Sequence, residues 1–306
     1  MSLRLSIVTP SYNQGPFIED AVASVLGQDY KCIEYLVIDA ESNDETAQIV
    51  SRYVSDLTWV REPDRGQADA VNKGFRLSRG EVLGWLNADD VYCPGSFAEV
   101  AQRFQDDPDL MLLYGDAEHV DGEGRFLEKY PTRAFHLESF ASHCFICQPA
   151  CFFRKSLIEA VGFLDIDLQY ALDLDLWIRC GLLQREHPSW KFEYLPRVLA
   201  RSRMHQDNKT LSKRRDSLLE IIRVVDKHFG CVPFNWVYRL QEASSGPYDG
   251  YFRRSPFSIS LWAKSVLHWL WMNRANPYYV LSYARDRLLS PRRSLRSFLG
   301  QQGGRA

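Results

Sequence analysis

Apolar runs that end in polar residues alternate with segments of helical periodicity along the first ninety residues. Residues 5–13 (LSIVTPSYN) are rich in β-forming side chains and end in turn formers, and residues 15–28 repeat apolar side chains at helical spacing. The same pattern predicts strands at 33–44, 57–64 and 81–90 and helices at 45–54 and 66–78. Strands that alternate with helices pair in parallel through right-handed crossovers, so helices should cover both faces of an α/β sheet.

The alternation weakens from about residue 110, where predicted strands follow one another more often. The pattern predicts strands at 110–120, 125–130 and 192–205, a β-rich run at 144–153, and helices at 154–165 and 173–183. The rest of the chain has mainly helical patterning with loops.

Polar side chains gather at the carboxyl ends of the predicted strands, namely Thr9, Tyr12, Asp39, Asp64 and Asp89. Open α/β sheets bind ligands in the crevice beyond those ends. The glycine fingerprint of dinucleotide-binding folds and the phosphate loop with Gly-Lys-Ser/Thr are both missing from the sequence. Hydride transfer and nucleotide hydrolysis by those folds are therefore disfavoured, whereas a nucleotide could still bind through a metal at its diphosphate.

One apolar strand stops abruptly on Asn87, Ala88, Asp89 and Asp90. Adjacent carboxylates repel one another unless a proton, a basic side chain or a metal offsets their charge. The residues alone leave two explanations open, a polar strand end or helix cap on one side and a cation site on the other.

The composition is ordinary for a globular protein of 306 residues, with 45% hydrophobic and 25% charged residues. The net charge of −2 conceals an asymmetry, because the residues from Tyr251 onward include ten Lys or Arg and a single acid, Asp286. Residues 1–250 therefore carry a net charge of −11. This distribution argues against nucleic acid as a partner and leaves an anionic surface as a partner for the tail alone.

The seven cysteines, the lack of a secretory leader pattern and the lack of an apolar run near 18 residues predict a cytoplasmic protein with reduced thiols. His143, Cys144, Cys147 and Cys151 could be considered as zinc ligands. A lone Cys-x-x-Cys in apolar surroundings favours core thiols instead.

Much of the chain resembles the inverting family 2 glycosyltransferases with a GT-A fold. The resemblance covers roughly residues 3–205 and is carried, in the expected order, by residues 6–46, 62–90, 148–165 and 171–179. It implies a Rossmann-like, mixed and mostly parallel sheet flanked by helices, a nucleotide-sugar donor, a Mn²⁺ or Mg²⁺ ion and an acceptor hydroxyl. The implied domains are a catalytic domain at 1–210, with a nucleotide-binding half at about 1–110 and an acceptor half at about 111–210, and a helical extension at 211–306.

The resemblance also implies a nucleobase site. The loop after the first strand, with Thr9, Pro10 and Tyr12, would hold the base together with Asp39, which would accept a hydrogen bond from a uracil-type N–H. Glu41 stands near the usual second acid of this motif, but it is separated from Asp39 by Ala40. This departure weakens the assignment of the base.

The segment EPDRGQADAVNKG would cover the donor phosphates and sugar. Arg65 would face phosphate or base, and Asp69 would face sugar hydroxyls. Asn72 and Lys73 fit a helix surface equally well, although Lys73 could also contact the donor.

The metal signature of the family falls on Asn87, Ala88 and Asp89. Asp89 occupies the position that binds the cation directly, and Asn87 replaces the first acid beside the ribose, so the site should bind metal weakly without nucleotide. His205 follows the late strand where related enzymes often bring a His to the metal or diphosphate, with a structural His as the alternative.

The base that deprotonates the acceptor matches Asp173 in the pattern Asp-x-Asp-Leu-Trp. Two acids spaced by two on a helix project about 200° apart, so Asp175 should serve elsewhere, for instance in a pair with Arg179. Trp177 is expected in the core. Gln148 and the strand-end residue Asp116 would line the acceptor side, although a plain turn explains Asp116 comparably well.

The C-terminal tail carries Trp262, Trp269 and Trp271 among Ser, Lys and Arg. Residues 254–300 could lie on the inner face of the cytoplasmic membrane as an amphipathic helix, or could pack against the catalytic domain or a sister subunit in a homo-oligomer.

These features predict a metal-dependent inverting hexosyltransferase that transfers a sugar, with UDP as the expected carrier, to a hydroxyl of a glycan or lipid-linked saccharide in bacterial surface polysaccharide assembly. Two rivals remain. A sugar nucleotidyltransferase would need a glycine- and lysine-rich loop near the amino terminus, which is missing. A non-catalytic sugar-nucleotide-binding scaffold would need neither Asp89 nor Asp173.

Overall fold

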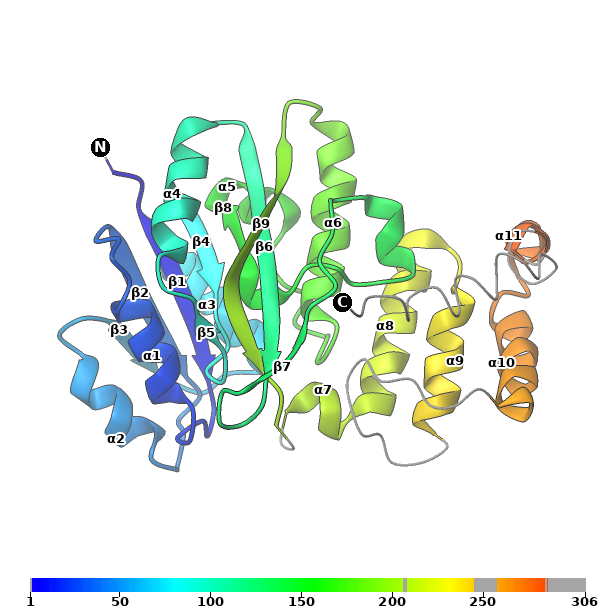
Figure 1. The fold of residues 1–306 in the computed structure, drawn as a ribbon, viewed down its shortest axis with the longest axis horizontal. Helices are drawn as coiled ribbons and strands as arrows, with labels where there is room; N and C mark the ends of the chain where they lie inside the picture. The colour runs from blue at the N-terminus through cyan, green and yellow to red at the C-terminus, as the bar shows by residue number, and fades with distance from the viewer. Residues whose placement is uncertain (1, 206–207, 245–257, 284, 286–306) are drawn as a thin grey trace, which may run out of the picture. The chain divides into compact units, whose positions relative to one another are not determined.

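The computed structural model describes residues 2–205, 208–244, 258–283 and 285. The chain divides into two compact units, Met1–Glu220 and Ile221–Ala306. The first unit contains a mixed β-sheet with helices between its strands, and the second is helical (Figure 1).

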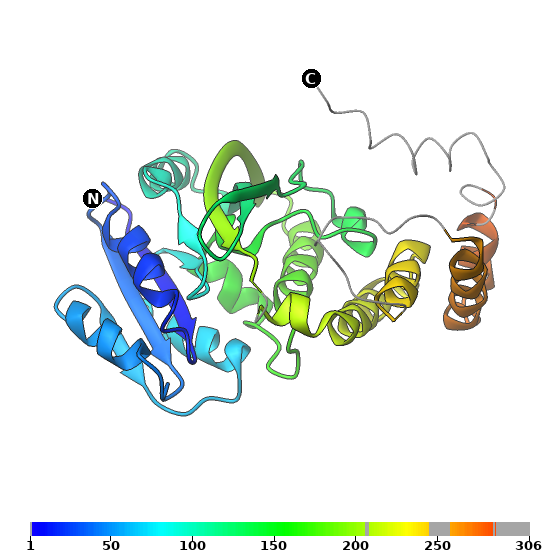
Figure 2. The same cartoon turned by 60° about the horizontal axis from the view of Figure 1, so that its bottom comes forward.

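The described part of the first unit builds one nine-stranded sheet in the order β3-β2-β1-β4-β8-β6-β9-β5, with β7 paired to β6. The strands are β1 Leu5–Ser11, β2 Ile33–Asp39, β3 Thr58–Arg61, β4 Val82–Trp85, β5 Val91–Tyr92, β6 Leu110–Val120, β7 Phe126–Lys129, β8 Cys151–Arg154 and β9 Lys191–Arg203. The first four strands are parallel, β8 is antiparallel to β4 and β6, and β9 runs parallel to β6 over its length (Figures 1 and 2). The predicted α/β class with a mixed sheet is confirmed.

Helices connect the strands and continue to the end of the described chain. They are α1 Ile18–Leu26, α2 Thr46–Val50, α3 Gln67–Leu77, α4 Ser96–Asp106, α5 Lys155–Val161, α6 Leu172–Glu186, α7 Lys209–Ser212, α8 Arg214–Phe229, α9 Phe234–Ala243, α10 Ile259–Met272 and α11 Pro277–Tyr283. Three 3₁₀ turns, η1 Ser51–Tyr53, η2 Leu137–Ala141 and η3 Gln148–Ala150, complete the secondary structure.

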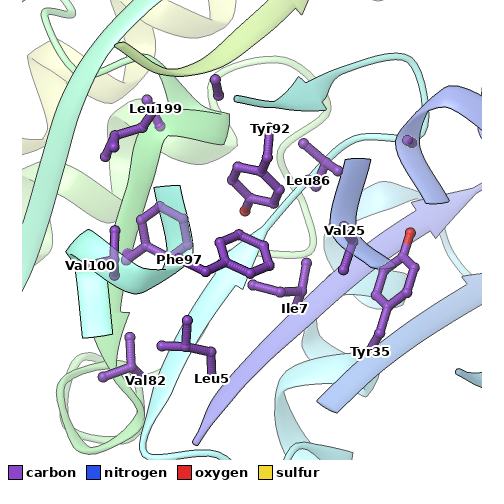
Figure 3. Packing of buried hydrophobic residues seen from close by; sticks show 14 of the residues in the cluster. Leu5, Ile7, Val25, Tyr35, Val82, Leu86, Tyr92, Phe97, Val100 and Leu199 are labelled. Carbon is purple, nitrogen blue, oxygen red and sulfur yellow. The ribbon is translucent and has the colours of Figure 1, made fainter. Parts of the chain in front are cut away.

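Alternate residues of β1 point to opposite faces of the sheet, as the two-residue period of a strand requires. Ile7 belongs to the buried cluster that includes apolar residues of α1 and α4, among them Val25 and Phe97 (Figure 3). Val8 points the other way, where a Cβ on Gly74 of α3 would meet its methyl group at 2.2 Å. Helices therefore cover both faces of the parallel strands, and glycine lets α3 approach β1 closely.

The structure corrects three local predictions from the sequence. The run at 144–153 is a strand only from Cys151 onward, because η3 precedes it and contains Pro149, which has no backbone N–H for a strand ladder. Asp116 lies within β6 rather than at a strand end or in a turn. Asn72 is buried rather than on a helix surface, and its side chain bonds both backbone groups of Leu164 at 2.9 and 3.0 Å.

The second unit is organised around Trp269, which is fully buried. Its indole N–H donates to the carbonyl of Val232 at 2.8 Å, and its ring packs against Phe234 and Tyr283. For the tail tryptophans the sequence left a membrane surface and packing against protein as alternatives; Trp269 is a core residue, whereas Trp271 is 59% exposed. Residues 254–257, 284 and 286–300 of the predicted membrane contact lie outside the described residues. Among the helices that the structure describes, none has the length and apolarity to cross a bilayer.

Candidate active site

The carboxyl ends of β1 and β2 are tied together by side-chain hydrogen bonds. The Asn13 N–H donates to the Ser42 hydroxyl at 2.9 Å, and the Asn43 N–H donates to the Asn13 side-chain oxygen at 2.9 Å. Asn13 and Glu41 both have positive φ, of 52° and 56°. Backbone in this sparsely populated region, held by reciprocal contacts, is typical of a ligand-binding loop.

The predicted nucleobase residues fall into two environments. Thr9 and Pro10 lie inside β1 and are buried, so their expected position in the following loop is wrong. The Thr9 hydroxyl bonds the Tyr35 hydroxyl at 3.1 Å. Tyr12 follows the strand and is 59% exposed, so it offers an aromatic face to a base.

Asp39 is fully buried at the end of β2. One carboxylate oxygen accepts hydrogen bonds from the backbone N–H and hydroxyl of Ser42. The other has no hydrogen-bond donor among the described residues and lies 3.5 Å from the Arg61 Nε atom. A buried oxygen with spare acceptor capacity suits recognition of an N–H group on a ligand.

The segment between β3 and α3 is folded around Asp69. The backbone N–H of Arg65 donates to Asp69 at 3.1 Å, while the Arg65 guanidinium is 72% exposed and 4.0 Å from the same carboxylate. Lys73 bonds the carbonyl of Pro63 at 2.6 Å and pairs with Glu62 at 3.0 Å. Arg65 is therefore available to a ligand, whereas Lys73 holds the segment in place.

Asn87 is fixed by two donors to its side-chain oxygen. The Trp85 indole N–H donates at 2.9 Å and the Gln67 amide donates at 2.7 Å, which turns the Asn87 amide nitrogen toward Asp90 at 3.4 Å. Ala88 is buried beside it. No role was predicted for Gln67, although its place directly after Gly66 in the donor segment is a signal that could have identified it.

The two neighbouring carboxylates of this turn have separate roles. Asp90 is buried and accepts a hydrogen bond from the Arg203 backbone N–H at 2.9 Å, which joins the turn to β9. Burial, together with the charge of Asp89, raises the pKa of Asp90 well above its ordinary value. Asp89 points instead to His205, with 3.1 Å between its Oδ2 and the His205 Nε2.

Asp89 and His205 fit a metal centre in part. Carboxylate oxygen and imidazole nitrogen are both ligands of Mn²⁺, and the two side chains are 17% and 12% exposed. The Phe17 ring centroid lies 4.5 Å from that of the His205 ring, and the Arg203 guanidinium stands over the same Phe17 ring at 5.0 Å, so the imidazole is held in place. Within the described part of the chain, no cluster of three or more His, Cys, Asp or Glu could hold an ion. The remaining ligands of such an ion would come from donor phosphates and water.

Asp173 occupies the first turn of α6 and is half-buried. Burial raises the pKa of Asp173 to about 6, against the opposing effect of the Leu174 N–H that donates to it at 2.8 Å. A carboxylate with this pKa is ionised at pH 7 and is a stronger base than an ordinary Asp.

The helix surrounding Asp173 follows the sequence prediction closely. Asp175 is fully buried and pairs with Arg179, whose Nε lies 2.6 Å from it. Trp177 is also fully buried in the core, as expected. Asp173 is therefore the carboxylate of this pattern that remains accessible to a substrate.

The Asn87–Asp90 turn and the start of α6 meet near η3. Asp90 and Asp173 both act electrostatically on the buried Cys147 thiol, adding to the effect of burial that raises its pKa. The next residue, Gln148, donates its amide to the carbonyl of Trp85. Its side-chain oxygen is buried and has no partner among the described residues. The candidate base, the Asn87–Asp90 turn and a polar residue predicted on the acceptor side therefore all lie near the Cys147 thiol.

Asp116 and the cysteines complete the set of predicted residues. Asp116 accepts a hydrogen bond from the Tyr194 hydroxyl at 2.7 Å, which gives it a structural use between β6 and β9. Cys147 and Cys151 are buried, and burial raises their pKa values well above the ordinary range, whereas His143 is exposed. Protonated, buried thiols are poor metal ligands, so this arrangement favours core packing over zinc binding.

Comparison with known proteins identifies the class of this α/β chain. Residues 6–171 match the family model described as Glycosyl transferase family 2, so the chain belongs to that family. An uncharacterised glycosyltransferase of Rickettsia prowazekii is 29% identical over 215 residues, which is 66% of this chain and 64% of the relative. The chain thus spans less than two thirds of that relative's length. The O-antigen biosynthesis protein RfbC of Myxococcus xanthus is 36% identical over 129 residues, 39% of this chain and 10% of RfbC.

Solved structures share the fold. Residues 1–349 of TarS from S. aureus, in complex with UDP-GlcNAc, align with a TM-score of 0.58 and 17% identity over 78% of this chain and 71% of that one. The mannosyltransferase PcManGT from Pyrobaculum calidifontis, in complex with GDP-Man and Mn²⁺, aligns with a TM-score of 0.56 and 18% identity over 98% of this chain and 81% of that one. The sheet described above is therefore the GT-A fold of glycosyltransferases.

Proposed function

We propose that this family 2 glycosyltransferase is a metal-dependent, inverting hexosyltransferase that uses a UDP-sugar. Its acceptor would be a hydroxyl of a glycan or lipid-linked saccharide in polysaccharide biosynthesis. The proposal is supported by the electrostatic effect of both Asp90 and Asp173 on the buried Cys147 thiol, by the bond from the neighbouring Gln148 to Trp85, and by the raised pKa of Asp173. The names of TarS bound to UDP-GlcNAc and of RfbC support the donor and the pathway class.

The side chains at the strand ends would each bind a different part of the donor. Tyr12 would stack on the base, and the Asp39 oxygen that lies 3.5 Å from Arg61 would accept its N–H. The exposed guanidinium of Arg65 would face phosphate or base, and Asp69 would face the sugar. Asp89 and His205 would hold a divalent cation, which when bound offsets the charge that develops on the leaving diphosphate.

Asp173 would act as the general base that deprotonates the acceptor hydroxyl. The acceptor oxygen attacks the anomeric carbon, its proton passes to the Asp173 carboxylate, and the bond between that carbon and the diphosphate oxygen breaks. Attack from the face opposite the leaving group inverts the anomeric configuration, and it needs only this one base. Gln148 would orient the acceptor beside it.

A screen of nucleotide sugars for thermal stabilisation tests the donor assignment. A ligand at one hundred times its dissociation constant stabilises the native state by about 2.7 kcal/mol. For a folded unit of this size, that free energy raises the melting temperature by roughly 5–10 °C. We expect UDP-sugars with Mn²⁺ to give this shift and UDP-sugars with EDTA to give little. A larger shift with GDP-sugars would overturn the choice of UDP.

We also propose that the second unit binds an anionic bilayer surface, on the cytoplasmic side. Its described helices α10 and α11 expose a set of apolar side chains, with exposed fractions of 40–85%, namely Ile259, Leu267, Leu270, Trp271, Tyr278 and Leu281. Residues 258–285 contain Lys264, Arg274 and Arg285 and no acidic residue. Exposed apolar and aromatic side chains among cations suit the boundary between headgroups and acyl chains.

Vesicle sedimentation of the full chain tests this surface. We expect binding to vesicles with anionic phosphatidylglycerol, weaker binding to neutral phosphatidylcholine, and at least a tenfold loss in the L267S/W271S variant, because each apolar side chain adds roughly 1–2 kcal/mol when buried. L77S is the matched control, since Leu77 is 51% exposed on the first unit. Equal binding by both variants would refute the proposal, and loss of a dimer in L267S/W271S without loss of vesicle binding would assign the surface to a second copy.

A further inference from the structure

Three consecutive backbone N–H groups converge on the carboxylate of Glu220. Gln169, Tyr170 and Ala171 donate to it at 3.0, 2.6 and 2.7 Å. Glu220 belongs to α8, about fifty residues further along the chain, and it is only 9% exposed. Successive backbone N–H groups that point to one place form a binding site for an anion, and here the protein's own carboxylate fills it.

The segment held by Glu220 is tied at its start by the bonds between Asn72 and Leu164, and Glu220 holds its end. Residues 162–171, between α5 and α6, contain turns and bends but no helix or strand. Ala171 is the N-cap residue of α6, yet it has no side chain that could cap the helix. The Glu220 carboxylate therefore fixes the point at which α6 begins, and Asp173 lies two residues beyond that point.

The same segment also borders the donor side of the site. The Gln169 side chain lies 3.5 Å from the position that a Cβ would take on Gly66, the N-cap residue of α3. Gly66 is bonded in turn to Asp64 at 2.8 Å. Residues 169–171 thus stand between the donor segment and the start of α6.

We propose that Glu220 is a positioning residue, which places the Asp173 carboxylate by anchoring residues 169–171 from α8. This inference rests on the proposed role of Asp173 as the base. Glu220 itself would touch neither donor nor acceptor. Its carboxylate holds the end of the loop against the helix, which keeps α6 from fraying at its first turn and limits the access of water to Asp173.

Two measurements that need no substrate test the anchor in E220Q. Hydrogen exchange of the amides at 169–171 should accelerate at least tenfold, because all three N–H groups bond the same carboxylate oxygen and the neutral oxygen of a Gln accepts more weakly than a charged one. In ¹³C-aspartate spectra, the carboxyl titration of Asp173 should move down from about 6 by half a unit or more as water reaches it. D173N identifies the Asp173 signal.

Two variants separate positioning from loss of charge or of fold. E220D keeps the carboxylate. It should retain at least part of the protection of amides 169–171 from hydrogen exchange and part of the raised pKa of Asp173. D216N removes an equal charge from an exposed residue of α8 that accepts no hydrogen bond from the backbone of residues 169–171, and it should leave both readouts unchanged. Unchanged exchange and titration in E220Q would overturn the inference, as would equal effects in D216N. Full turnover by D173N would instead overturn the base assignment, whatever the outcome for Glu220.

Discussion

Replacing Asp173 by Asn should lower turnover by roughly 10²–10⁴-fold while donor binding persists, because the general base is removed and the donor contacts are not. Steady-state kinetics with the donor found by thermal screening, together with calorimetric donor affinity, would check this result. Asp175→Asn is unsuitable as a control because Asp175 is buried against Arg179. The exposed Asp167 of the preceding loop is the better match, and D167N should keep normal turnover. Near-normal turnover of D173N would reassign the base.

The raised pKa of Asp173 leads to two further predictions, one for the native enzyme and one for D173N. Turnover of the native enzyme should fall below about pH 6 as the base becomes protonated. The folded state holds this proton more tightly than the unfolded state, so the carboxyl lowers the free energy of unfolding as the pH rises from about 4 to about 6. D173N should therefore be more stable than the native chain at pH 7, by at most about 3 kcal/mol at 1.36 kcal/mol per pKa unit. At pH 4 the two melting temperatures should nearly coincide.

Replacing Asp89 by Ala should abolish the part of donor affinity that depends on Mn²⁺. Asp89 and His205 are the two candidate ligands on the protein, so losing the carboxylate leaves a lone imidazole. Calorimetric titration of the UDP-sugar with Mn²⁺ and with EDTA would measure the difference, which we expect to vanish in D89A and to shrink in H205A. The exposed Asp106 of α4 supplies the control D106A. A Mn²⁺-dependent affinity that survives in D89A would place the ion elsewhere.

The sequence was most informative where local pattern and tertiary structure agree. The apolar runs of β1 to β4 are bounded by turn residues, and each polar strand end lies where parallel strands bring their carboxyl ends to one edge. The separate fates of Asp173 and Asp175 follow from helical geometry alone.

The sequence was least informative where a residue's role depends on a distant partner. Glu220 resembles any other glutamate in a helix, because the sequence around it does not indicate that three backbone N–H groups of residues 169–171 donate to it. Trp269 reads as interfacial in the sequence, and only its bond to Val232 shows that it faces inward. The spacing of Asn72 on α3 likewise could not reveal that it bonds Leu164, which is 92 residues away along the chain.

The proposed cation centre, with two candidate ligands among the described residues, has a kinetic consequence. Asp89 and His205 alone would hold an ion weakly, so the ion and the nucleotide sugar would bind together. The UDP product would then leave together with the ion. Free UDP should then compete with fresh donor more strongly at high Mn²⁺ than at low Mn²⁺. The rate of the enzyme in a cell would accordingly depend on the ratio of UDP-sugar to free UDP rather than on the concentration of the metal.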